Sequence, residues 1–287
     1  MNKTGIHKLY NWKKGMVSWK IGKTLYLSVV FTWQLPAAKK LAKSWKGKVI
    51  AGGPAVSVMP DYLRDVAACY TETVFPVLAH HNPMATFTTR GCPNNCSFCA
   101  VPKSEGEFRE LEQWVVAPVV CDNNLLASSR QHFDSVIDRL KAMPYVDFNQ
   151  GLDARHLTSH HLDRLSELRV TTLRFAFDHI DKETIIMNAL SQAKRKGFRD
   201  LRVYVLIGHE DTPEDAIYRL EIVRGAGALT NPMRYQPLYS VKKNEYVGDR
   251  WTENELKNVM RYYSRLIFLG HIPFDEYCDS MNSRRKQ

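Results

Sequence analysis

The sequence predicts an α/β fold in which a parallel sheet curls into a partial (βα)6, TIM-like barrel. Two observations predict it. From residue 85 onward, short apolar segments of strand type alternate with segments of helical spacing. A hydrophobic content of 44% over 287 residues also allows a full core to form. In such a barrel the reactive face lies at the C-terminal ends of the strands, so we expect functional residues there.

Residues 1–84 are expected to form a basic N-terminal extension with one short βαβ unit. Its first 24 residues show no clear period. Residues 25–33 are a β-branched and aromatic run, residues 35–46 have helical spacing, and residues 47–56 resemble a buried strand that ends in glycines. The glycine pair 52–53 lacks the spacing of a dinucleotide-binding fingerprint, so we expect a tight turn there.

Residues 85–240 are expected to form the barrel, and residues 241–287 a C-terminal helical extension. The expected strands cover residues 85–89, 114–121, 145–150, 171–178, 201–208 and 233–239. The expected helices cover residues 128–143, 159–168, 182–197 and 212–227. The tail from Trp251 to about Arg265 is expected to be another helix, followed by a polar, basic end.

The positive charge is concentrated at one end of the chain. The formal net charge is +10, and residues 1–60 contain eleven lysines and no aspartate or glutamate. The remaining 227 residues carry 29 Lys+Arg against 30 Asp+Glu. A lysine-only segment is either a solvated basic face or an electrostatic contact for the phosphates of a nucleic acid or nucleotide. Charge alone leaves both possibilities open.

The composition indicates a cytoplasmic protein without a membrane partner. No stretch has about 18 consecutive apolar residues, and the N-terminus has no apolar run of signal-peptide type. Cys69, Cys121 and Cys278 are scattered, unlike the regular disulfide framework of a small secreted protein. In a reducing compartment, thiolates are available to bind metal.

The other three cysteines, Cys92, Cys96 and Cys99, lie together in the loop after the first expected barrel strand. Zinc takes four tetrahedral ligands, commonly as two pairs, and no second Cys or His pair follows nearby. His80 and His81 could supply a fourth ligand, but they precede that strand. A cubane iron–sulfur cluster held by three thiolates keeps one iron open for a substrate or cofactor. A zinc loop or buried structural thiols remain the competing interpretation.

The segment "CPNNCSFC" has the CxxxCxΦC form that marks the radical S-adenosylmethionine (radical SAM) superfamily, with Phe98 as the aromatic residue. The chain resembles this family from residue 85 to about 240. The resemblance implies a [4Fe-4S] cluster bound by Cys92, Cys96 and Cys99, with S-adenosylmethionine on the fourth iron. It further implies an enzyme that cleaves S-adenosylmethionine reductively to a 5′-deoxyadenosyl radical, which abstracts hydrogen from an unknown substrate. A reductant such as flavodoxin or ferredoxin would supply the electron, and the partial barrel is the superfamily's fold.

The resemblance also implies which residues contact S-adenosylmethionine. These expected contacts lie in the cysteine loop and at strand ends: Phe98, Asp122, Asn123, Gln150, Asp153, Arg155 and Gly208. The stretch from Asp122 to Asn124 stands where the family holds the methionine amino group, and an Asx turn that caps the next helix is the alternative. Arg155 suits a carboxylate by its forked donors, although Asp153 and Arg155 could equally form a solvated pair. Gly208 matches the family's adenine-contacting element only loosely.

The βαβ unit is similar to the end of the cobalamin-binding domain that precedes the barrel in one branch of the superfamily. The chain is short for the complete domain and has no Asp-x-His-x-x-Gly motif, so we do not expect cobalamin to bind. A second cluster is not expected either, since only Cys278 lies in the tail. Two alternatives stay open. One is a noncatalytic iron–sulfur or zinc protein that binds nucleic acid through its basic N-terminus, and the other is a redox dithiol protein.

Overall fold

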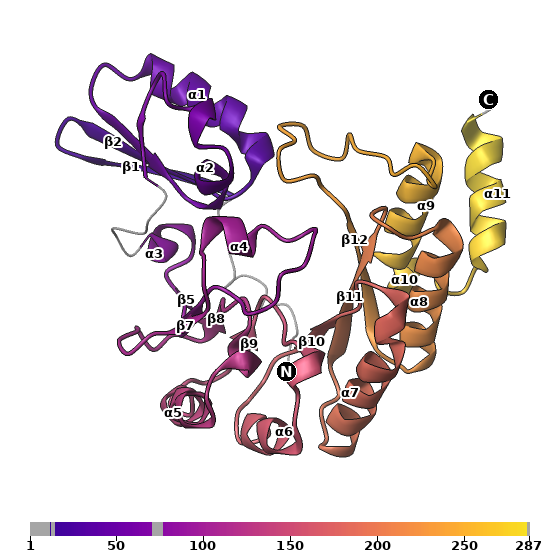
Figure 1. Ribbon diagram of the computed structural model, residues 1–287. Coiled ribbons are helices and arrows are strands. Elements are labelled where there is room, and N and C mark those ends of the chain that lie inside the picture. The colour runs from indigo at the N-terminus through magenta and orange to yellow at the C-terminus, as the bar shows by residue number, and fades with distance from the viewer. Residues whose placement is uncertain (1–11, 13–14, 71–76, 286–287) are drawn as a thin grey trace. The chain divides into compact units, whose positions relative to one another are not determined.

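A computed structural model describes residue 12 and residues 15–70 and 77–285 (Figure 1). The chain forms two compact units. The first comprises the described residues up to Gln150, together with Glu167–Val170 and Gln236–Lys243, and the second comprises Gly151–Ser166, Thr171–Tyr235 and Asn244–Gln287. Within the described residues, no helix has the length and apolar character that crossing a membrane requires. The three-part division expected from the sequence stays a prediction.

The first unit begins with a four-stranded sheet of order β1-β2-β3-β4. Strands β1 and β2 form an antiparallel hairpin, and β3 and β4 continue the sheet in parallel. The strands are β1 Met16–Ile21, β2 Thr24–Val29, β3 Val49–Gly52 and β4 Ala68–Cys69. Helix α1 (Leu35–Ser44) buries Leu35, Ala38 and Ala42 in the same core as Leu25, Leu27 and Val29 of β2. The expected βαβ unit is therefore present as β2, α1 and β3.

A second part of the first unit carries the cysteine loop. Strands β5 (Ala85–Thr86), β8 (Val119–Val120) and β9 (Asp147–Phe148) form a parallel sheet of order β5-β8-β9. Strands β6 (Thr89–Arg90) and β7 (Arg109–Glu110) form a separate antiparallel pair. The remaining helices and 3₁₀ turns of this unit are α2 Pro54–Val58, η3 Pro60–Tyr62, α3 Leu78–His81, α4 Val101–Ser104, η4 Leu125–Ala127, α5 Arg130–Leu140 and, before α1, η2 Thr32–Gln34.

The second unit is built on a parallel sheet of order β10-β11-β12, with β10 Leu173–Ala176, β11 Leu201–Ile207 and β12 Leu229–Arg234. Alternate residues of β11 are buried, as in a strand with one face toward a core. Helix α8 packs on β11 and β12, and α9 packs on β12 (Figure 1). The helices and 3₁₀ turns of this unit are η5 Ala154–His156, α6 Ser159–Leu165, η6 Ile180–Lys182, α7 Glu183–Arg195, α8 Pro213–Gly225, α9 Glu253–Tyr263, α10 Leu266–Leu269 and α11 Phe274–Arg285.

Parallel strands alternate with helices in both units, which confirms the α/β class but does not confirm that the strands form one partial barrel. Six of the described barrel-region strands belong to two three-stranded parallel sheets, while β6 and β7 form a separate antiparallel pair. A β-bridge between Val146 and Val170 extends the first parallel sheet. The expected last strand at 233–239 is wrong in position, because β12 ends at Arg234 and residues 235–239 are irregular. The partial barrel therefore stays a prediction.

Candidate functional site

The cysteine loop connects two paired strands, β6 and β7. The chain leaves β6 at Arg90, passes through the three cysteines and α4, and returns at Arg109 of β7, where Arg90 and Arg109 are register partners. The pairing closes the base of the loop. The loop can therefore take an irregular path over its cysteines while both of its ends stay fixed.

The three thiols are half-buried and none forms a disulfide. Two side-chain amides donate to the Sγ atom of Cys92, with the Nδ2 atoms of Asn94 and Asn124 each at 3.5 Å. The backbone N–H of Val101 donates to the Sγ atom of Cys99 at 3.5 Å. The thiolate is the form of cysteine that binds metal. Soft sulfur ligands with N–H donors around them fit an iron–sulfur cluster.

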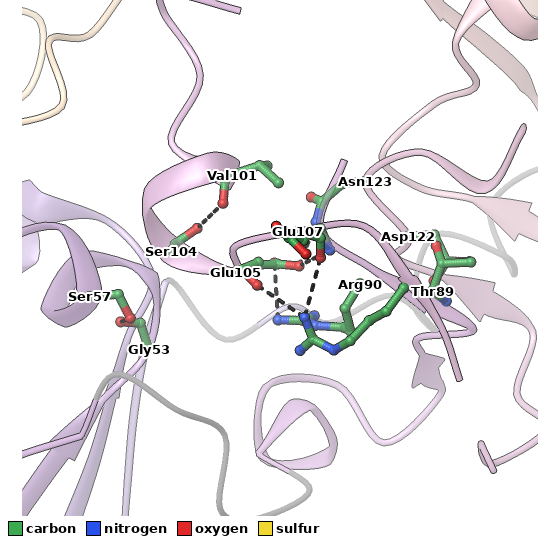
Figure 2. Close-up of polar contacts among 12 residues, drawn as sticks. Gly53, Ser57, Thr89, Arg90, Val101, Ser104, Glu105, Glu107, Asp122 and Asn123 are labelled. Carbon is green, nitrogen blue, oxygen red and sulfur yellow. Dashed lines mark hydrogen bonds and ion pairs between the residues drawn. The ribbon is translucent and has the colours of Figure 1, made fainter. Parts of the chain in front are cut away.

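Glu105 joins three segments around the loop (Figure 2). Its carboxylate forms an ion pair with Arg90 at 3.0 Å and accepts hydrogen bonds from the backbone N–H of Gly91 at 2.9 Å and from the Nδ2 atom of Asn123 at 2.8 Å. The Arg90 guanidinium also lies 3.8 Å from the centre of the Phe87 ring. The Glu105 and Arg90 side chains are only 9% and 16% exposed. Glu105 therefore connects the start and the end of the cysteine loop to the segment after β8.

Gly91 is the residue that lets the loop begin. Its φ of +72° lies in the left-handed region, and a Cβ atom there would lie 2.3 Å from the carbonyl oxygen of Glu107. Any other residue would meet both backbone strain and a steric clash. The glycine thus fixes the turn that carries the chain from β6 into Cys92.

Asp122 is buried, and its carboxylate accepts three hydrogen bonds from Thr88 and Thr89, where β6 begins. The donors are the backbone N–H of Thr88 at 2.6 Å, the Thr88 hydroxyl, and the backbone N–H of Thr89 at 3.0 Å. Burial raises the pKa of Asp122, and the hydrogen bonds from Thr88 and Thr89 act in the opposite direction. In this structure Asp122 connects the end of β8 to β6, while its expected contact with a cofactor stays a prediction.

The remaining expected contacts fall in both units. Phe98 is half-buried in the cysteine loop, and Gln150 is exposed just after β9. In the second unit, Arg155 donates to both carboxylate oxygens of Asp153, at 2.8 and 2.7 Å, and its backbone N–H donates to the same carboxylate at 3.0 Å. Burial would raise the pKa of Asp153, but the hydrogen bonds and charge of Arg155 outweigh it and hold this pKa below its usual value. Asp153 and Arg155 thus form a bidentate ion pair, but the Asp153 side chain is only 12% exposed, so the pair is not a fully solvated one.

Gly208 follows β11 and begins a turn that a buried carboxylate organises. Asp211 accepts hydrogen bonds from the N–H groups of Gly208 at 2.8 Å and His209 at 3.2 Å. It also binds the fully buried Arg219 and accepts from the indole N–H of Trp251 at 3.1 Å. This network was not predicted from the sequence. The signal that could have predicted it was Arg219, an arginine at a buried position of α8. A buried arginine needs a carboxylate or carbonyl partners.

Glu105, Asn94 and the Asn124 contact to sulfur were also missed. The motif names only the cysteines and the aromatic residue, and Glu105 lies outside it. The one available signal was Arg90, a charged residue at the end of an apolar strand. Among the described residues, no group of three or more His, Cys, Asp or Glu side chains is arranged to hold a single metal ion.

Comparison with solved structures connects this geometry to known proteins. The chain is similar to two structures of the radical S-adenosylmethionine methyltransferase TsrM from Kitasatospora setae. In one, which has cobalamin and a [4Fe-4S] cluster bound, the match has a TM-score of 0.57 and 12% identity over 77% of this chain and 66% of that chain. In the other, which has tryptophan and the S-adenosylmethionine analogue aza-SAM bound, the TM-score is 0.59, with 12% identity over 77% and 65%. The chain has the fold of a radical SAM protein.

The resemblance to the radical SAM superfamily inferred from the cysteine motif is thus confirmed at the level of fold. The chain matches slightly less than two thirds of the length of TsrM. No protein-family model matches the chain, and no curated protein does. Because one TsrM structure contains cobalamin, the comparison does not support the expectation that cobalamin is absent from this chain.

Proposed function

We propose that the chain is a radical SAM enzyme whose Cys92, Cys96 and Cys99 hold a [4Fe-4S] cluster. When bound, the cluster would supply an electron and S-adenosylmethionine would supply the sulfonium that is cleaved, giving a 5′-deoxyadenosyl radical. This radical would abstract hydrogen from a substrate that the sequence and fold do not identify. The single observation that carries the proposal is the cysteine loop itself: three thiols at CxxxCxxC spacing, between paired strands, on a radical SAM fold.

The residues around the loop have defined tasks in this proposal. Asn94 and Asn124 orient the Cys92 sulfur and balance its negative charge, and Glu105 holds the ends of the loop. Phe98, Asn123 and Gln150 lie in the cysteine-bearing unit, where they would contact S-adenosylmethionine together with Asp122. The contacts expected of Asp153, Arg155 and Gly208 stay predictions, and these residues lie in the second unit.

Cobalamin is a further cofactor to be tested. The N-terminal βαβ unit resembles part of a cobalamin-binding domain, and a solved structure of similar fold has cobalamin bound. The chain lacks the His-containing ligand motif, so any bound cobalamin would have to be held without it. Absorbance of the protein after incubation with cobalamin and removal of the excess by gel filtration tests this directly.

Anaerobic reconstitution tests the main proposal. We expect the protein to bind about four irons, and to release 5′-deoxyadenosine from S-adenosylmethionine after reduction. The variants Cys92→Ala, Cys96→Ala and Cys99→Ala should lose both properties, whereas Cys278→Ala, a free cysteine outside the loop, should keep them. An iron-free protein with zinc on the three thiols would contradict the proposal. A cluster-bearing protein that never cleaves S-adenosylmethionine would instead favour a noncatalytic iron–sulfur protein.

A further inference from the structure

Exposed lysines lie on two neighbouring segments, the β1–β2 hairpin and the segment at and after the end of α1. We call this the lysine surface. All of its lysines are exposed. Its members are Lys20 and Lys23 of the hairpin and Lys43, Lys46 and Lys48 at and after the end of α1.

Contacts between the two segments hold these lysines together. The Lys20 ammonium lies 4.5 Å from the centre of the Trp45 ring, and the Trp45 indole N–H donates to the carbonyl oxygen of Lys23 at 3.1 Å. A Cβ atom at Gly47 would lie 2.4 Å from that same carbonyl oxygen, so only glycine permits this approach. The backbone N–H of Leu25 donates to the carbonyl oxygen of Lys48 at 2.9 Å. The lysine surface is thus built by folded segments far apart in sequence.

Few acids lie near the lysine surface in the part of the chain that the structure describes, and the charge of Lys43 contributes, after the hydrogen bond from Lys39, to lowering the pKa of Asp65. Among the described residues, none of its five lysines forms an ion pair. Asp65 pairs with Lys39 at 2.8 Å, and residues 1–60 contain no acid at all. Five like charges in one place repel one another and lower the stability of the fold. A bound polyanion would remove that cost.

We propose that the lysine surface binds the phosphate backbone of a nucleic acid without reading its sequence. Lysine is a flexible point charge that binds phosphate from many directions, and contacts to phosphates position a protein on nucleic acid without specifying bases. The proposal concerns a partner of the folded chain. It does not depend on the cluster or on the cleavage of S-adenosylmethionine.

Two other anionic partners fit the surface less well. Protein interfaces are depleted in lysine and depend on aromatic and arginine anchors, and residues 1–60 contain no arginine. A helix that binds a lipid surface needs an apolar face to insert. The apolar residues of α1, Leu35, Ala38 and Ala42, are instead buried against the sheet.

Salt-dependent binding of the full chain tests the proposal. The probes are a fluorescent single-stranded oligouridylate and a DNA duplex of mixed sequence, titrated by anisotropy at several salt concentrations. Each phosphate neutralised by a lysine contributes about 0.7 to the slope of log K against log salt for a single strand and about 0.9 for a duplex. The variant Lys20→Gln/Lys23→Gln/Lys46→Gln should therefore flatten the single-strand slope by roughly 2 and weaken binding by tenfold or more.

The matched control removes three charges that already have acidic partners. Lys141 pairs with Glu167 at 2.6 Å, Lys196 with Asp163, and Lys257 with Glu253 at 3.1 Å. The variant Lys141→Gln/Lys196→Gln/Lys257→Gln should keep the wild-type slope, and circular dichroism checks that both variants fold. Equal losses in the two variants would overturn the proposal, as would lysine-surface-dependent binding to phosphatidylserine vesicles without binding to either nucleic acid. Because no step involves iron, this outcome is independent of the test of the proposed enzyme.

Discussion

At the scale of single residues, the Cys92 sulfur accepts two hydrogen bonds, one from the side-chain amide of Asn94 and one from that of Asn124. N–H donors to a cluster sulfur stabilise the more negative, reduced state and so raise the reduction potential. We predict that Asn124→Ala, in the reconstituted protein, moves the potential of the cluster to more negative values. A redox titration followed by electron paramagnetic resonance measures the shift.

Asn95 supplies the control for this prediction. It lies in the same loop, is exposed, and has the same side chain as Asn94. Asn95→Ala should leave the potential unchanged. If Asn124→Ala keeps the wild-type potential while the iron content is normal, the amide does not act on the cluster sulfur. A loss of iron together with a normal potential in the remaining clusters would point to a purely structural role.

Cys121 is buried, whereas the three cysteines of the loop are half-buried. It is 3% exposed, and burial raises its pKa to about 12. Below that pH the thiol stays protonated, so at pH 8 only about one molecule in ten thousand carries the reactive thiolate. We predict that iodoacetamide at pH 8 leaves Cys121 unmodified in the folded chain and alkylates it in urea. Peptide mass spectrometry reads this out, and rapid modification of the folded chain would contradict the burial.

At the scale of elements, Glu105 is the connection between α4, β6 and the segment after β8. Removing one partner of a buried ion pair leaves the other charge without compensation, at a cost of about 3 kcal/mol. We predict that Glu105→Ala lowers the midpoint of thermal unfolding by roughly 5 °C or more and reduces the iron bound on reconstitution. Glu107→Ala, which changes an exposed carboxylate two residues away, should do neither. Equal effects of the two substitutions would show that Glu105 has no special role.

The elements also show what the sequence could predict. The helices α5, α7 and α8 lie within the expected ranges because their apolar periodicity and end signals are local. Strand β12 was expected several residues too late, because Leu229–Arg234 contains Asn231 and Pro232 instead of an apolar run. Its place at the edge of the sheet tolerates that proline.

The same contrast holds at the candidate site. The three cysteines and Phe98 were recognised because their spacing is local and chemically restrictive. Glu105 could not be predicted from the sequence, because its partners Arg90, Gly91 and Asn123 come together only when the chain folds. Strand β1 was missed for a related reason: its apolar residues do not alternate strictly, and its pairing with β2 is what makes it a strand. Helix α11 likewise lies where a polar, basic end was expected, and it buries the side chain of Tyr277.

At the scale of the whole molecule, the first compact unit is not made of residues 1–150 alone. It also uses Glu167–Val170 and Gln236–Lys243. Val170 bridges to Val146, the hydroxyl of Thr32 donates to the carbonyl oxygen of Ser240 at 2.6 Å, and Lys103 contacts Tyr239. A fragment that ends at residue 150 would lose all three contacts and leave Val146 without its neighbour on that side.

We therefore predict that the fragment 1–150 unfolds at a lower temperature than the full chain, although it contains every cysteine of the loop together with Asn124 and Glu105. Lost burial, hydrogen bonding and strand pairing all act in that direction. Circular dichroism during heating, at matched concentration, measures the difference, and iron content after reconstitution shows whether the loop still forms. A fragment that melts at the same temperature as the full chain and binds iron equally well would mean that the later segments contribute nothing to the cysteine-bearing unit.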